Sequence, residues 1–155
     1  MVLERVKKKL SMEKRPKKKR IGLLVDGPNM LRHELGTDLR EVRRALEEHG
    51  TIKFGGVFLD QHAPEKLIEA VANQGFQPML VITDDVDAPM AAEAMELIFN
   101  KHIDTIALMT RDSDFQSVLL KAKKYGKETI VVGAEPFSTS LRNTADHVII
   151  VGKKG

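Results

Sequence analysis

The chain has 155 residues, 42% of them hydrophobic and 30% charged, which is the size and make-up of one compact domain. It contains no cysteine, so disulfide frameworks, thiolate metal sites and cysteine nucleophiles are excluded. No apolar run approaches the ~20 residues of a membrane-spanning helix, and no apolar stretch follows the basic N-terminus as in a secretory signal, so we expect a cytoplasmic protein.

Charge is distributed unevenly along the chain. Residues 1–20 hold ten Lys and Arg against two Glu, a balance of +8, whereas residues 21–155 hold fifteen against twenty Asp and Glu, a balance of −5. Such a basic segment attracts a polyanion without sequence preference, although a tail that only aids solubility has the same composition. We therefore expect a basic N-terminal tail over residues 1–20 and one domain over residues 21–152.

From residue 21 onward, short apolar runs alternate with amphipathic segments. The runs are typical of buried strands, and the segments between them begin and end at capping residues such as Asp38, Pro64, Pro89 and Gly126. In chain order, the pattern predicts a strand at 21–25, a helix at 38–50, a strand at 52–59, a helix at 64–75, a strand at 76–82, a helix at 89–101, a strand at 105–109, a helix at 113–125, a strand at 129–132, a weaker helix at 137–143 and a strand at 147–151.

This alternation indicates the fold class. Strands that alternate with helices form a mostly parallel sheet with helices on both faces, because right-handed crossovers return each strand beside the previous one. We therefore predict an α/β fold, a three-layer α/β/α Rossmann-like sandwich. In such folds ligands bind outside the carboxyl ends of the strands, so the residues that follow each strand are the candidates for chemistry.

Carboxylates follow three of the predicted strands. The segments are Val25-Asp26-Gly27-Pro28-Asn29, Thr83-Asp84-Asp85-Val86-Asp87 and Thr110-Arg111-Asp112-Ser113-Asp114. Like charges held close together repel and raise one another's pKa, so a cation is expected between them. Oxygen ligands suit hard divalent ions, and we predict a site for Mg²⁺ or Mn²⁺.

Each acid also has a purely structural interpretation. Asp87 precedes Ala88-Pro89 and could be a helix N-cap, and Asp112 or Ser113 could cap the next helix. Asp26 before Gly-Pro could stabilise a turn. Capping does not explain why acids recur at three strand ends, so the metal site is the favoured interpretation.

Several motifs together resemble a known family. They are Leu24-Val25-Asp26-Gly27-Pro28-Asn29, Val86-Asp87 with Ala92-Glu93-Ala94-Met95-Glu96-Leu97, Ile103-Asp104-Thr105-Ile106, and Thr110-Arg111-Asp112-Ser113-Asp114-Phe115, with a late Ser138, Leu141 and Ala145-Asp146. The chain is similar over about residues 20–151 to the NYN domain, the branch of PIN-like nucleases that includes the LabA-like (DUF88) proteins. The resemblance implies a PIN-like sandwich, an acidic metal-binding pocket and RNA cleavage or processing.

The resemblance also implies roles for individual residues. Asp26, Asp87, Asp112 and Asp114 match the acidic positions, as catalytic residues and metal ligands, and Asn29 matches the polar residue that orients a phosphate or water. Glu93 stands where relatives commonly have Asp and is a further candidate ligand. It lies six residues after Asp87 on the same predicted helix, so we expect only one of the two to face the pocket directly.

The sequence departs from the family pattern at two places. Arg111 stands where a small residue is usual, and we expect it either to crowd the pocket or to contact a phosphate. Asp84 and Asp85 replace an expected Lys-Gly and add negative charge near the site. Binding of RNA would then depend on the metal and on the basic tail. The expected RNA-binding residues are Lys17, Lys18, Lys19 and Arg20 at the end of the tail, and Arg111 beside the acids.

The sequence thus favours a metal-dependent hydrolase of the endoribonuclease type. Three alternatives remain open at this point. They are a non-catalytic RNA-binding or regulatory protein that keeps the pocket, a metal-dependent phosphohydrolase acting on a small phosphate, and a scaffold that associates through its apolar helix faces. The expected partner is RNA, a homodimer is a further expectation, and no membrane is expected.

Overall fold

The computed structural model of the chain describes residues 2–3, 18–31, 37–83 and 85–152. In these residues six strands form one sheet in the order β3-β2-β1-β4-β5-β6, and every neighbouring pair is parallel. The strands are β1 (Arg20–Asp26), β2 (Thr51–Leu59), β3 (Gln77–Leu80), β4 (Thr105–Met109), β5 (Glu128–Gly133) and β6 (His147–Ile150).

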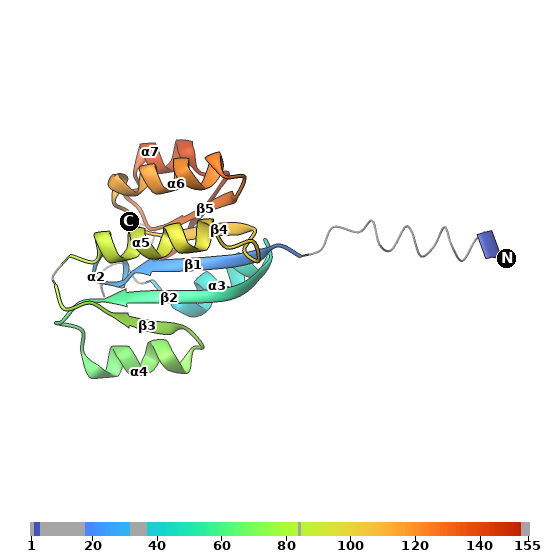
Figure 1. Ribbon diagram of the computed structural model, residues 1–155. Helices are drawn as coiled ribbons and strands as arrows, with labels where there is room; N and C mark the ends of the chain where they lie inside the picture. Colours follow the sequence, from blue (N-terminus) through green and yellow to red (C-terminus); the bar gives the residue numbers. More distant parts are fainter. Residues whose placement is uncertain (1, 4–17, 32–36, 84, 153–155) are drawn as a thin grey trace.

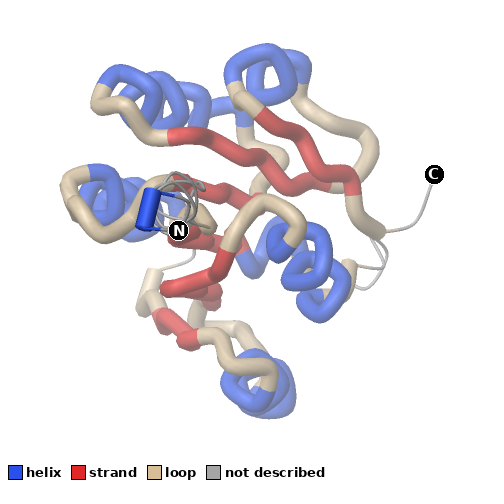
Figure 2. Tube along the Cα trace, turned by 90° about the vertical axis from the view of Figure 1, so that its right-hand side faces the viewer, coloured by secondary structure: helices blue, strands red, loops and turns tan. Residues whose placement is uncertain are grey.

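Helices cover both faces of this sheet (Figures 1 and 2). The helices are α2 (Gly27–Met30), α3 (Leu39–Glu47), α4 (Glu65–Asn73), α5 (Asp87–Ile98), α6 (Gln116–Lys124) and α7 (Thr139–Thr144). Alternate residues of β1 enter different cores: Leu23 packs with α3 and α4 residues, whereas Leu24 packs with α5 and α6 residues. The fold is therefore the predicted three-layer α/β/α Rossmann-like sandwich.

The predicted strands and helices are confirmed, with differences at their ends. The short helix α2 was not predicted; it follows β1 directly and has Pro28 in its first turn. The predicted helix at 113–125 is divided into a 3₁₀ turn, Ser113–Phe115, and the α-helix α6. β1 begins at Arg20, so this last residue of the expected tail belongs to the sheet.

The parallel sheet has two chemically different edges. We call the edge where the strands end the carboxyl edge and the edge where they begin the amino edge. β1 reaches from Arg20 at the amino edge to Asp26 at the carboxyl edge, a distance of ~20 Å at the usual rise per residue. Lys18 and Lys19 lead into β1, so the chain enters the domain at the amino edge (Figure 1).

Among the described residues, no helix combines the length and the apolar character needed to cross a bilayer.

Candidate metal centre at the carboxyl edge

Asp26 is the last residue of β1 and is buried, with 3% of its surface exposed. Its Oδ1 accepts a hydrogen bond from the backbone N–H of Asn29 at 3.4 Å and so caps α2. Burial raises the pKa of Asp26, and the hydrogen bonds from Asn29 and Thr110 only partly oppose this effect. Asp26 is thus a buried carboxyl group, held in a fixed orientation at the edge of the sheet.

Gly27 allows α2 to begin directly against β2. A Cβ atom at this position would lie 2.2 Å from the carbonyl oxygen of Phe58, a separation that no side chain tolerates. Asp26 pairs with Phe58 in the β1–β2 register, so the chain must turn into α2 beside that carbonyl. Glycine here lets Asp26 both end the strand and cap the helix.

Thr110 connects Asp26 to the acids that follow β4. Val25 pairs with Met109 in the sheet, which brings the residues after both strands side by side. The fully buried Thr110 hydroxyl lies 3.4 Å from Oδ2 of Asp26, to which it donates, and it accepts the backbone N–H of Asp112 at 3.1 Å. No role was expected for Thr110 from the sequence, although a Thr two residues before an acid is a pattern for such local bonds.

Asp87, Asp112 and Asp114 form the aspartate cluster. One carboxylate oxygen from each of these residues lies within 4.8 Å of the others, and no other such group of three His, Cys, Asp or Glu occurs in the described parts of the chain. The cluster draws on two separate segments, because Asp87 is the first residue of α5 whereas Asp112 and Asp114 follow β4. β2 and β1 lie between β3 and β4 in the sheet, so the segments meet because the chain crosses from β3 to α5, which packs against β1 and β4.

The pKa of Asp87 is raised to about 7. Burial is the largest cause, followed by a side-chain hydrogen bond with Asp112 and by the negative charges of Asp112, Asp85 and Asp26. Asp87 therefore keeps its proton up to about pH 7 when no cation is present, and its carboxyl group bonds to the side chain of Asp112. The charge of Asp26 also acts on Asp87, which places Asp26 beside the cluster.

Capping and clustering occur together at this edge. Asp112 caps the 3₁₀ turn, since its Oδ1 accepts the backbone N–H of Asp114 at 2.9 Å, and Ser113 does not cap it. Asp85, which was expected only to add negative charge, accepts the N–H of Asp87 at 2.8 Å. The expectation that Asp87 could be the N-cap is therefore wrong: Asp87 is in the first turn of α5, and its carboxylate is left for the cluster.

The donor set fits a hard divalent cation. The cluster offers only carboxylate oxygens, which are the ligands preferred by Mg²⁺ and Mn²⁺. Two oxygens on opposite sides of Mg²⁺ lie about 4.2 Å apart, so separations of up to 4.8 Å need only a small closing movement. A cation here would replace the proton that Asp87 otherwise holds.

Comparison with known proteins assigns the chain to a family. The family model of the NYN domain matches residues 20–152. The chain belongs to the NYN domain family. Its relationship to the PIN-like nucleases is consistent with an acidic cluster at the carboxyl edge of a parallel sheet.

One relative and one solved structure of similar fold extend the comparison for this NYN domain. The uncharacterized protein MJ0482 of Methanocaldococcus jannaschii is 55% identical over 142 residues, which are 91% of this chain and 59% of that protein. The chain thus spans only 59% of the length of this relative. A crystal structure of VPA0982 from Vibrio parahaemolyticus, a protein of unknown function, has a TM-score of 0.77 at 19% identity, covering 90% of this chain and 97% of that one. This similarity supports the fold.

Glu93 of the NYN domain lies away from the aspartate cluster. Six residues of α5 separate it from Asp87, which is ~9 Å along a helix axis. It lines a different cavity of about 430 Å³ together with Arg20 and Phe54. Burial and the neighbouring Glu96 raise the pKa of Glu93. Of the two candidate ligands on this helix, only Asp87 joins the cluster.

Arg111 lies between Thr110 and Asp112 and is half-buried. Its Nε is buried and has no hydrogen-bond partner among the described residues. A buried N–H without a partner costs free energy, so this group is available to an anionic ligand. Asn29 is also half-buried, in α2, and both its backbone and its side chain donate to Asp26.

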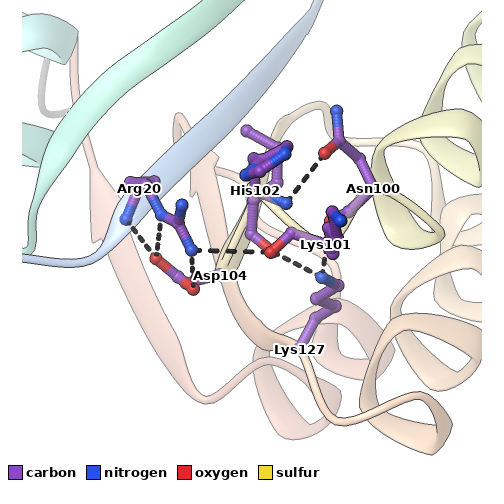
Figure 3. Close-up of polar contacts among 7 residues, drawn as sticks. Arg20, Asn100, Lys101, His102, Asp104 and Lys127 are labelled. Atoms are coloured by element: carbon purple, nitrogen blue, oxygen red, sulfur yellow. Dashed lines mark hydrogen bonds and ion pairs between the residues drawn. The ribbon is translucent and has the colours of Figure 1, made fainter.

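The expected RNA-binding residues of the tail lie at the other edge. Arg20 forms a two-pronged ion pair with Asp104, with 3.0 Å from Nε to Oδ2 and 3.1 Å from Nη2 to Oδ1 (Figure 3). This pair holds the pKa of Asp104 down at about 2. Lys19 pairs with Glu128, Lys18 is exposed, and Lys17 lies outside the described residues.

Proposed function

We propose that this NYN domain is a metal-dependent ribonuclease that hydrolyses RNA phosphodiester bonds with Mg²⁺ or Mn²⁺. The observation that carries the proposal is the aspartate cluster, three carboxylates from two separate segments of the chain with oxygens within 4.8 Å of one another. The raised pKa of Asp87 marks a place where positive charge is needed. The family relationship supports RNA as the substrate.

Asp87, Asp112 and Asp114 would hold the cation, with Asp26 beside them. When bound, a divalent cation neutralises charge on a phosphodiester and lowers the pKa of bound water. Thr110 fixes Asp112 relative to Asp26 through its two hydrogen bonds. The Nε of Arg111 donates to a phosphate oxygen of the substrate, and Asn29 keeps Asp26 oriented.

A direct test is the substitution Asp112→Asn, assayed with Mn²⁺ and a labelled single-stranded RNA. We expect cleavage to fall by more than the ~10–100-fold typical of removing an outer partner of a metal ligand, because Asp112 is itself in the cluster. The matched control is Glu69→Gln on the exposed part of α4, which changes the same chemical group and should keep the parent rate. Equal cleavage rates for Asp112→Asn and the parent would contradict the proposal.

A second candidate function is RNA binding without cleavage. The basic residues at the amino edge favour it, because they do not depend on the aspartate cluster. This function would be selected if calorimetry detects binding of Mn²⁺ and of RNA while an activity assay detects no cleavage. Hydrolysis of a chromogenic phosphate ester that Asp26→Asn abolishes, with no preference for polymers, would instead select a phosphohydrolase of small substrates.

A further inference from the structure

An open cavity of about 990 Å³ lies at the amino edge, far from the aspartate cluster. Its lining is mostly polar and includes an exposed aromatic ring, Tyr125, which follows α6. Five basic side chains line it, against three acidic ones. The basic ones are Lys18, Lys19, Arg20, Lys123 and Lys127, and the acidic ones are Asp104, Glu128 and Asp146.

The acidic side chains of this cavity are already paired. Arg20 binds Asp104, Lys19 binds Glu128, and Lys123 lies 3.8 Å from Asp146. Lys18 has no ion pair with a carboxylate among the described residues, and the charge of Lys127 also acts on Asp104, whose pKa it lowers. With five basic against three acidic side chains, the lining of the cavity carries a net positive charge. Two further exposed lysines, Lys101 and Lys124, lie at the same edge.

The loop between α5 and β4 is held in place by polar contacts (Figure 3). Lys127 donates to the carbonyl oxygen of Asn100 at 2.9 Å and also to that of Ile103. The Asn100 side chain accepts the N–H of His102 at 2.8 Å, and Arg20 reaches the carbonyl of Lys101 at 3.5 Å. This network fixes the loop that carries Lys101, so its charge is presented from a defined position.

Two aromatic rings stand exposed beside these charges. Phe99 is 63% exposed and Tyr125 is 47% exposed, and their ring centroids lie 4.8 Å apart at an angle of 64°. The ammonium group of Lys124 lies 5.8 Å from the Tyr125 ring. Exposed aromatics interleaved with lysines are the combination that binds single-stranded nucleic acid, because bases stack on the rings while phosphates contact the cations.

We propose that the amino edge is an RNA-binding exosite, in which Phe99 and Tyr125 stack on bases and Lys18, Lys101 and Lys124 contact phosphates. That the bound polymer is RNA rests on the proposed function. The exosite lies ~20 Å from Asp26, and stacked nucleotides rise ~3.4 Å each, so a strand must exceed about six nucleotides to occupy both edges. The exosite therefore favours long single strands over short ones.

The test compares three double variants of the full chain, each built on Asp112→Asn to prevent cleavage. They are Phe99→Ala with Tyr125→Ala, Lys101→Glu with Lys124→Glu, and the control Arg44→Glu with Lys66→Glu on the α3 and α4 side of the sheet. All six side chains are exposed, so folding should be kept, and circular dichroism verifies it. Fluorescence anisotropy then measures the affinity for a labelled 20-nucleotide single-stranded RNA.

We expect at least tenfold weaker binding for each of the two exosite variants and less than a twofold change for the control. Affinities equal to the parent for both exosite variants, or an equally large decrease in the control, would overturn the proposal. Cleavage is measured separately, in the same variants with Asp112 restored. If the parent binds the RNA through the exosite and never cleaves it, the hydrolase proposal fails and the exosite stands. If the parent cleaves the RNA and the exosite variants bind it with the affinity of the parent, the exosite proposal fails and the hydrolase proposal stands.

Discussion

At the scale of single residues, the acids of the carboxyl edge each do two things. Asp26 uses Oδ1 to cap α2 and Oδ2 to accept from Thr110. Asp112 uses Oδ1 to cap the 3₁₀ turn while its side chain also bonds to Asp87. Caps fix where each carboxylate points without using all of its lone pairs. The structural and functional interpretations of these acids are therefore compatible.

The raised pKa of Asp87 predicts how stability depends on pH in the absence of metal. In the folded state Asp87 keeps its proton up to about pH 7, whereas in the unfolded state it ionises near its ordinary pKa of 3.8. The folded state binds more protons in this window, so the contribution of Asp87 to stability falls as pH rises from about 4 to about 7. Asp87→Asn removes this contribution.

Thermal unfolding in EDTA at pH 4.5 and at pH 7.5 measures this effect. We expect the Tm of Asp87→Asn, relative to the parent, to be higher at pH 7.5 than at pH 4.5. Adding Mn²⁺ should raise the Tm of the parent more at pH 7.5 than at pH 5, because at pH 5 the cation has to displace the proton of Asp87. If the Tm of the parent instead rises relative to that of Asp87→Asn as the pH increases in EDTA, the raised pKa of Asp87 is contradicted.

At the scale of elements, the turn from β1 into α2 decides where Asp26 points. Gly27 lies so close to the Phe58 carbonyl that any side chain would push α2 away from β2. At the other end of β1, Arg20 joins the strand to Asp104, just before β4, through a backbone and a side-chain bond. Both ends of the central strand are thus fixed by contacts with neighbouring strands.

Gly27→Ala should therefore damage both stability and activity. The overpacking is expected to cost ~1–3 kcal/mol, which lowers the Tm by a few degrees in a domain of this size. Cleavage should fall further than this destabilisation explains, because Asp26 would move with α2. The control is Gly126→Ala, whose site is sterically open but has a φ of +81°, so it should lower the Tm and leave cleavage per folded molecule unchanged. Normal cleavage by Gly27→Ala would argue against a role for the Asp26 geometry.

At the scale of the whole molecule, charge is separated along the strand direction. The aspartate cluster lies at the carboxyl edge, whereas the lysines of the exosite and the entry of the basic segment lie at the amino edge. Residues 1–17 add seven Lys and Arg against two Glu to the chain that leads into this edge. We therefore expect a polyanion to be attracted first to the amino edge, apart from the aspartate cluster.

Removal of residues 1–17 tests this separation and the proposed domain boundary. The shortened chain should keep the Tm of the parent, because β1 begins only at Arg20. Its affinity for single-stranded RNA should fall, and the dependence of log affinity on log salt should become shallower by about 0.7 for each phosphate that the protein no longer neutralises. A shortened chain with an unchanged salt dependence would show that the tail takes no part in binding.

Local sequence patterns are enough to predict the succession of strands and helices along the chain and the candidate acids. Apolar runs and helical segments with caps are local signals, so β1, β2, β4 and β5 could be placed without coordinates. The rule that ligands lie at strand carboxyl ends then pointed to Asp26, Asp112 and Asp114, and the motifs indicated the NYN family.

Which of these residues meet depends on how distant segments pack. The sheet register brings Thr110 between Asp26 and Asp112, and the packing of α5 places Glu93 in a cavity with Arg20 and Phe54. Arg20 was expected to bind RNA, yet its charge is paired with Asp104, 84 residues away. Sequence periodicity reports on neighbours within a helix or strand, whereas ion pairs and metal sites depend on distances that are set when distant segments pack together.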